Sequence, residues 1–229
     1  RYGYRRITAL LRHRGWRVNH KRVERIWRRE GLKVPGKQPG RARLWLNDGS
    51  CIRLRPEHGN HVWAYDFIFD RTREGRPLKL LTGVDEFTRE CLAIEVGSRL
   101  RGEDVARVLN RLVYLRGAPQ ALFADNGAEF TGQIVDLGAY HHKVKMDFSR
   151  PGTPTDNAHI ESFNGSLRDE CLNINWFASL AEARRLIEAW RRDYNESRPH
   201  MAHNGQSPDE FARNAGLCHG GKVKIATGF

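Results

Sequence analysis

The chain has 229 residues, of which 39% are hydrophobic, and its net charge is +12. That length suffices for one medium-sized domain and a smaller appendage, and the hydrophobic content can support a buried core. No run of about 18 apolar residues is present, which excludes a membrane-spanning helix. The Arg-rich start lacks the apolar segment of a secretory signal. The four cysteines form no CxxC pair, so we expect reduced thiols in a cytosolic protein rather than a zinc or redox site.

The positive charge is concentrated at the start of the chain. Residues 1–43 hold 15 of the 39 Lys and Arg residues but only 2 of the 27 acidic residues, so their net charge is +13 and that of the remainder is −1. A basic segment of this density predicts a polyanionic partner, most often nucleic acid. A basic disordered tail is the alternative, and the apolar periodicity of the segment argues against it.

Two short helices are predicted within this basic head. Apolar residues repeat at helical spacing in RRITALLRHR and again in KRVERIWRRE, with Gly15 and Gly31 as stops and Asn19 as an N-cap. Two such helices joined by a tight turn are typical of a helix-turn-helix, although a generic helical hairpin has the same pattern. We therefore expect residues 1–35 to be a basic helical DNA-binding segment, with DNA contacts from Lys21, Arg22 and Arg25.

An α/β domain follows a linker. Residues 36–60 are rich in Pro, Gly and charge, with a possible short strand at 44–46. The remaining pattern predicts three strands, a helix ended by Gly117, a strand, a helix, a strand and a further helix, which together indicate a mixed sheet. We expect the α/β core at 61–175 and a C-terminal helical extension at 176–229. The predicted capping boxes of that extension are Ser179 with Glu182 and Ser207 with Glu210, with Pro208 at the first helical position.

Two aspartates occupy unusual positions in the predicted strands. Asp66 lies inside the apolar run VWAYDFIF, where an unpaired carboxylate is costly to bury. It must therefore be paired with a cation, reach the end of the strand, or bind a metal. Asp125 closes the predicted strand ALFAD immediately before Asn126, where a turn residue is the ordinary alternative. Tyr65 is expected to face the opposite side of the strand and to lie in the core.

A third carboxylate, Glu161, lies early in the helix that follows the loop at 149–156. If Asp156 caps this helix, its core face consists of Ile160, Phe163, Leu167 and Cys171, and Glu161 points away from the core. We therefore expect Glu161 to lean over the sheet edge where the two aspartates meet. A Glu in the first turn is also common for electrostatic reasons alone. The competing acidic candidates are Asp70, Asp85 and Glu129, and Asp85 is expected to be a turn residue at a strand end.

Three carboxylates from two strands and a helix form the ligand set that Mg²⁺ prefers, and Mn²⁺ is the usual substitute. Two such ions about 3.5–4 Å apart can bind both the attacking and the leaving oxygen of a phosphodiester displacement. Asp66 is the expected bridge between the two ions. The composition alone does not distinguish hydrolysis from strand transfer.

These residues resemble a known catalytic core. Asp66 in WAYDF, Asp125 in ADNGAEF and Glu161 in PTDNAHIESFNGSLRDECL resemble the retroviral-integrase core, and the longer runs resemble insertion-sequence transposases of the "IS-three" family, second reading-frame product. The resemblance covers nearly the whole chain, including the basic head. It implies an RNase H-like fold preceded by a helix-turn-helix-like segment, with the three acids as catalytic metal ligands. It also implies that Arg168 lies near the bound DNA end, with further DNA-binding candidates at Asn126, Asn157 and Asn164.

The resemblance also implies a biological setting. The expected function is metal-dependent cleavage of element ends followed by strand transfer by the freed 3′-hydroxyl. The expected partners are the element ends, target DNA and further copies of the chain, together with a DNA-binding segment supplied by an upstream reading frame. The expected location is the bacterial cytoplasm, in association with the nucleoid. The chain begins at Arg1 without an initiator Met, which suggests a piece of a longer product. The segment RPHMAHNGQSPDEFA departs from the family pattern, outside the predicted acidic site.

Three alternatives to this function remain. The first is an RNase H-like nuclease that hydrolyses DNA without strand transfer. The second is an inactive DNA-binding remnant or a repressor of transposition, which the presence of all three acids disfavours. The third is an ordinary transcription factor, which leaves Asp66 in an apolar strand unexplained.

Overall fold

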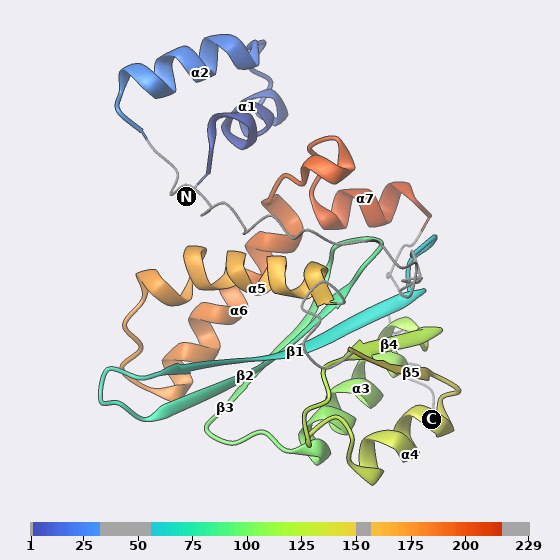
Figure 1. Cartoon of the computed structure of the whole chain (residues 1–229). Helices are drawn as coiled ribbons and strands as arrows, with labels where there is room; N and C mark the ends of the chain where they lie inside the picture. The colour runs from blue at the N-terminus through green and yellow to red at the C-terminus, as the bar shows by residue number, and fades with distance from the viewer. Residues whose placement is uncertain (1, 33–55, 150–156, 217–229) are drawn as a thin grey trace, which may run out of the picture.

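The computed structural model describes residues 2–32, 56–149 and 157–216, and a five-stranded mixed sheet lies at its centre (Figure 1). The strand order is β3-β2-β1-β4-β5. The strands are β1 (Val62–Arg71), β2 (Pro77–Asp85), β3 (Cys91–Gly97), β4 (Ala121–Ala124) and β5 (Lys145–Phe148). The first three strands pair antiparallel, whereas β4 runs parallel to β1 and β5 runs parallel to β4. The predicted mixed sheet is therefore confirmed.

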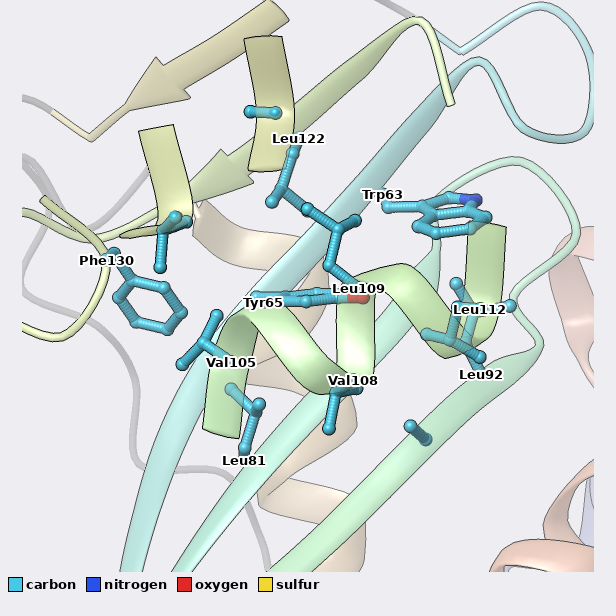
Figure 2. Close-up of a cluster of buried hydrophobic side chains, with 14 of the residues drawn as sticks. Trp63, Tyr65, Leu81, Leu92, Val105, Val108, Leu109, Leu112, Leu122 and Phe130 are labelled. Carbon is cyan, nitrogen blue, oxygen red and sulfur yellow. The ribbon is translucent and has the colours of Figure 1, made fainter. Parts of the chain in front are cut away.

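Helices cover both faces of this sheet. The helices α3 (Gly102–Arg116) and α4 (Gln133–His141) lie on one face, and α5 (Ala158–Glu170) and α6 (Leu180–Ser197) lie on the other (Figure 1). Figure 2 shows the first core, in which Trp63 and Tyr65 of β1 meet Leu109 and Leu112 of α3. The alternate residues Ala64 and Ile68 belong to the second core. The first part of β1 is thus buried on both faces, as its apolar sequence predicts, whereas Phe69 and Arg71 near its end are exposed.

The basic head forms two helices, α1 (Tyr4–His13) and α2 (His20–Arg29). Asn19 caps α2 as predicted, because its side chain accepts a hydrogen bond from the Lys21 backbone at 3.0 Å. Gly15 and Gly31 follow the two helices with φ values of +83° and +66°, a region that favours glycine. Arg6 of α1 pairs with Glu170 of α5 at 3.3 Å, which anchors the head to the α/β core. The expected strand at 44–46 lies outside the described residues.

The helix starts in the C-terminal part agree with the sequence in most details. Ser207 and Glu210 form the predicted capping box at α7 (Pro208–Asn214), with Pro208 in the first turn. Ser179 caps α6, but the carboxylate of Glu182 accepts from the Ala178 backbone N–H instead of closing the box on Ser179. Asp156 lies outside the described residues, and Asn157 is the residue before α5. Between residues 157 and 216 the structure also has two short 3₁₀ turns, Leu172–Ile174 and Met201–His203. Within the described ranges, no helix is long and apolar enough to cross a membrane.

A matched pair of leucines on α3 tests the packing of the first core. Leu109 is 0% exposed and Leu115 is 63% exposed. We expect Leu109→Ala to lower the free energy of unfolding by about 2–5 kcal/mol, because it removes buried methyl groups and leaves a cavity. Leu115→Ala, which makes the same change in the same helix, should change it by no more than about 0.5 kcal/mol. Urea denaturation at neutral pH measures both, and equal losses would contradict the packing of this helix.

Candidate active site

Asp66 lies on β1, and Asp125 directly follows the end of β4, the parallel neighbour of β1. The ladder between β1 and β4 pairs Ala64 with Phe123, and each aspartate follows its strand partner by two residues. Because side chains alternate along a strand, both carboxylates lie on the face covered by α5 and α6, like Ala64. The parallel topology therefore brings together two acids that are 59 positions apart in the sequence.

Asp66 is half-buried and held by two hydrogen bonds. One carboxylate oxygen accepts from the Phe67 backbone N–H at 2.8 Å, and the other accepts from the Asn164 side chain at 2.7 Å. The pKa of Asp66 is raised from 3.8 to about 6, mainly by burial and also by the negative charges of Asp125 and Glu161, while the two hydrogen bonds act to lower it. This carboxylate is thus short of positive charge, which is the condition that favours a bound cation.

Asn164 connects the helix α5 to the central strands. Its side-chain nitrogen donates to Asp66, and its oxygen accepts from the hydroxyl of the fully buried Thr82 at 2.9 Å. The same hydroxyl lies 3.1 Å from the Asp66 carbonyl oxygen. Since Asn164 and Glu161 share one helix, this network fixes α5 relative to Asp66. Asn164, predicted to bind DNA, therefore points at the acidic site.

Asp125 begins a tight loop after β4. Its carboxylate accepts from the Gly127 backbone N–H at 3.0 Å. A Cβ at Gly127 would lie 2.9 Å from that carboxylate, so a larger residue would displace the Asp125 side chain. The Asn126 side chain donates to the Ser149 carbonyl at 2.6 Å, which ties the loop to the end of β5. Asn126 thus has a structural bond, and it is also exposed.

Glu161 lies on the exposed side of the first turn of α5. The predicted core face of this helix is confirmed, because Ile160, Phe163, Leu167 and Cys171 are all buried. Glu161 is close enough to raise the pKa of Asp66. In the part of the chain that the structure describes, however, no three His, Cys, Asp or Glu side chains are grouped closely enough to hold a metal. The structure pairs the two aspartates and leaves Glu161 beside them, so the three-acid ligand set stays a prediction.

The other predicted DNA-binding residues differ in exposure. Arg168 is exposed and donates to the Phe69 carbonyl at 3.2 Å, so it lies over the far half of β1. Asn157 is buried, and its side-chain oxygen has no hydrogen-bond partner. The head residues are all exposed on α2: Lys21, Arg22 and Arg25.

The competing acids have other partners. Asp85 is fully buried and accepts from the backbone of Asn60, Phe87 and Thr88, which confirms that it is a turn residue. Asp70 accepts from the Arg71 backbone N–H at 2.8 Å. Glu129 pairs with Lys79, and this hydrogen bond lowers the pKa of Glu129.

Lys79 was missed by the sequence analysis. Its amino group contacts Glu129, donates to the Leu100 carbonyl at 3.2 Å and lies 4.1 Å from the centre of the Phe67 ring. It therefore fixes the loop of Asp125 to β2. The sequence did contain a feature that could have identified Lys79, because a lysine inside the apolar run LKLL is costly to bury, just as an aspartate is inside VWAYDF.

Comparison with protein families identifies two kinds of domain. The family described as integrase core domain matches residues 56–154, and a second integrase core domain family matches residues 142–208. An HTH-like domain family matches residues 1–40, in agreement with the predicted helix-turn-helix-like head.

Similar proteins come from bacterial insertion elements. An uncharacterized 31.7 kDa protein of insertion element IS407 from Burkholderia multivorans is 45% identical over 93% of this chain and 76% of its own length. An uncharacterized 39.2 kDa protein of insertion element IS476 from Xanthomonas euvesicatoria is 41% identical, and this chain spans 61% of its length. Transposase InsF for insertion sequence IS3A from Escherichia coli is 27% identical over 92% of this chain and 76% of its own length.

Solved structures share the fold at low sequence identity. The simian T-cell lymphotropic virus intasome contains a chain with a TM-score of 0.61 and 16% identity, covering 85% of this chain and 67% of that one. The HTLV-2 integrase catalytic core, solved with magnesium, gives a TM-score of 0.55 at 18% identity over 69% of this chain and 99% of that one. The predicted RNase H-like fold is therefore confirmed.

The raised pKa of Asp66 predicts a pH dependence of stability. Because the pKa of Asp66 is about 6 in the folded state and 3.8 in an unfolded chain, the folded state binds more protons between about pH 4 and pH 6. The free energy of unfolding should therefore fall as the pH rises through this window, by about 1–3 kcal/mol, and then level off. Asp66→Asn should remove this fall. Urea denaturation at several pH values, with EDTA present, measures it.

The control is Asp70→Asn. Asp70 lies on the same strand and accepts the same type of backbone hydrogen bond. This variant should keep the fall between pH 4 and pH 6, and a fall that persists in Asp66→Asn would contradict the assignment to Asp66.

Proposed function

This chain belongs to the integrase-core family of insertion-sequence transposases, and we propose that it cuts the ends of its own element and joins them to target DNA. The observation that carries this proposal is the proximity of three carboxylates. Asp125 and Glu161 both raise the pKa of Asp66, and Asn164, on the same helix as Glu161, donates a hydrogen bond to Asp66. The site needs no nucleophilic side chain, since water and then a DNA hydroxyl attack the phosphorus. The related proteins come from bacteria, so we place the reaction on bacterial DNA in the cytoplasm.

Asp66, Asp125 and Glu161 would hold the divalent cations. Hard carboxylate oxygens suit Mg²⁺, with Mn²⁺ as a substitute, and the raised pKa of Asp66 supports a need for compensating positive charge. The magnesium of the HTLV-2 integrase core supports the same choice of metal. Two bound ions supply Lewis-acid activation of a phosphodiester and of its attacking oxygen. On binding, the Asp66 carboxyl must lose its proton, so metal affinity should rise with pH around 6.

The reaction balances as two displacements at phosphorus. In the first, a water oxygen bonds to the phosphorus at the element end, the bond to the 3′-oxygen breaks, and a 3′-hydroxyl is released. In the second, that hydroxyl oxygen bonds to a target phosphorus while a target 3′-oxygen leaves with a proton. No covalent intermediate with the protein forms. Asn164 and Thr82 keep the Asp66 carboxylate oriented. Arg168, which is exposed on the same helix, would contact DNA phosphate beside the site.

The basic head would bind DNA mainly through its phosphates. Lys21, Arg22 and Arg25 are exposed on α2, as such contacts require. We propose that several copies of the chain act together on two element ends, and that a segment from an upstream reading frame adds DNA binding. The intasome similarity supports an assembly on DNA.

The acidic site is tested with supercoiled plasmid and Mg²⁺ or Mn²⁺. Asp125→Asn and Glu161→Gln should reduce nicking by about 100-fold or more, the scale of losing a group that stabilises transition-state charge. Asp169→Asn, an exposed acid on the same helix as Glu161, should nick like the parent. Gel electrophoresis separates nicked from joined products, and joined products favour a transposase over a nuclease that only hydrolyses.

Two outcomes would contradict this function. Unchanged nicking in the carboxylate variants would overturn the assignment of the site. A parent that binds DNA but never nicks it, even after the upstream segment is added, would indicate an inactive remnant or a repressor.

The head is tested separately by the salt dependence of duplex binding. Lys21→Ala, Arg22→Ala and Arg25→Ala should each weaken binding, and each should reduce the slope of log K against log salt by about 0.9 if it contacts one phosphate. The control is Arg28→Ala on the same helix, because Arg28 is paired with Glu24 at 2.7 Å and should have a smaller effect. Fluorescence anisotropy at several salt concentrations measures the slopes, and unchanged slopes would exclude α2 as a DNA-binding surface.

A further inference from the structure

A groove of about 600 Å³ lies on the face of the sheet opposite to Asp66. The strands β1 and β2 form one side of it, the turn between β3 and α3 forms another, and Glu129 closes it near the loop of Asp125. Its lining includes three exposed arginines from separate parts of the chain: Arg71, Arg99 and Arg101.

These three arginines carry uncompensated positive charge. Among the residues that the structure describes, none of their side chains has an ion-pair partner, whereas Arg107 and Arg111 of the neighbouring helix α3 pair with acids. The groove also contains two acids, Glu129, which pairs with Lys79, and Asp70, so four cationic side chains of the lining face two carboxylates and the net charge of the groove is positive. The groove therefore attracts a polyanion that can follow three separated positive charges.

An aromatic ring lies among these charges. Phe69, near the end of β1, is 65% exposed. Its ring centre is 5.5 Å from the Lys79 amino group, and its carbonyl oxygen accepts from Arg168 on the other face of the sheet. An exposed ring bordered by arginines is the arrangement on which nucleic-acid bases stack while phosphates are neutralised.

The groove is preformed and adjoins the acidic site. Lys79 binds both the Leu100 carbonyl and Glu129, so it joins β2, the turn before α3 and the loop after Asp125. Phe130 in that loop packs against Phe67 with ring centres 5.0 Å apart. Glu129 also lies close to Asp125, because a Cβ at Gly127 would be 3.4 Å from the Glu129 carboxylate and 2.9 Å from that of Asp125.

We propose that this groove binds an unpaired strand of DNA next to the cutting site, with phosphates at Arg71, Arg99 and Arg101 and a base stacked on Phe69. The proposal rests on the proposed function, because it takes the substrate to be DNA. It assigns to the catalytic core a contact surface that is independent of the basic head.

Binding of a labelled 20-nucleotide single strand and of its duplex, with EDTA present to prevent cutting, tests the groove by fluorescence anisotropy. The triple variant Arg71→Ala, Arg99→Ala and Arg101→Ala should lower the salt slope for the single strand by about 2, given about 0.7 per phosphate contact. Phe69→Ala should weaken single-strand binding by roughly 5- to 100-fold, as expected for one stacked base, and duplex binding much less. Phe69→Leu, which keeps an apolar side chain but no ring, should show the same selective loss.

The controls are Arg192→Ala, an arginine already paired with Glu188, and the combined head variant at Lys21, Arg22 and Arg25. Arg192→Ala should bind like the parent, and thermal melts confirm that each variant is folded. If single-strand binding is unchanged in the groove variants but lost in the head variant, the proposal that the groove binds DNA is wrong, and the proposed function stands. A parent that binds neither DNA would overturn both proposals. Preferential binding of a labelled poly-glutamate peptide over DNA would assign the groove to an acidic protein segment instead.

Discussion

The rest of the structure depends on a charged carboxylate held inside an apolar central strand. Asp66 interrupts β1, whose other inward residues fill the two cores on either side of the sheet. Burial makes the charged form of this group unfavourable, and the two neighbouring carboxylates add to the effect. A strand that was only structural would gain stability from an apolar residue here. In this chain, the Phe67 backbone and the Asn164 side chain each donate a hydrogen bond to the Asp66 carboxylate and stabilise it in one orientation.

A second charged cluster holds the helix that serves this site. Glu170, near the end of α5, pairs with Arg198 at 2.8 Å and with Arg6 of the basic head at 3.3 Å. Arg198 is 4% exposed and also donates to Ser166 of α5 at 3.0 Å. Loss of one partner would leave a buried charge uncompensated, which is costly. The basic head is thereby attached to α5, the helix that carries Glu161 and Arg168.

Much of this arrangement could be predicted from the sequence, because it follows from periodicity and from exceptions to it. The strands, the core face of α5 and the cap at Asn19 follow directly from local patterns. The pairing of Asp66 with Asp125 needed only the rule that parallel strands align their ends. The partners of long polar side chains could not be predicted, because they depend on tertiary distances. The hydrogen bond from Asn164 to Asp66 was not foreseen, and Glu182 reaches one residue beyond the expected cap.

Lys79 extends the reasoning that identified Asp66. Both residues are charged, both lie in otherwise apolar strands, and those strands are paired neighbours in the sheet. Their side chains serve opposite faces: Asp66 faces α5 and the acidic site, whereas Lys79 lies over the rings of Phe67 and Phe69 and binds Glu129. Since Glu129 and Asp125 belong to one loop, the cation on one face restrains the position of a carboxylate on the other. The sheet therefore connects the arginine-lined groove to the candidate catalytic acids through Lys79 and Asp66. In a sheet with only a structural role, charged side chains at these two positions would cost stability without a benefit.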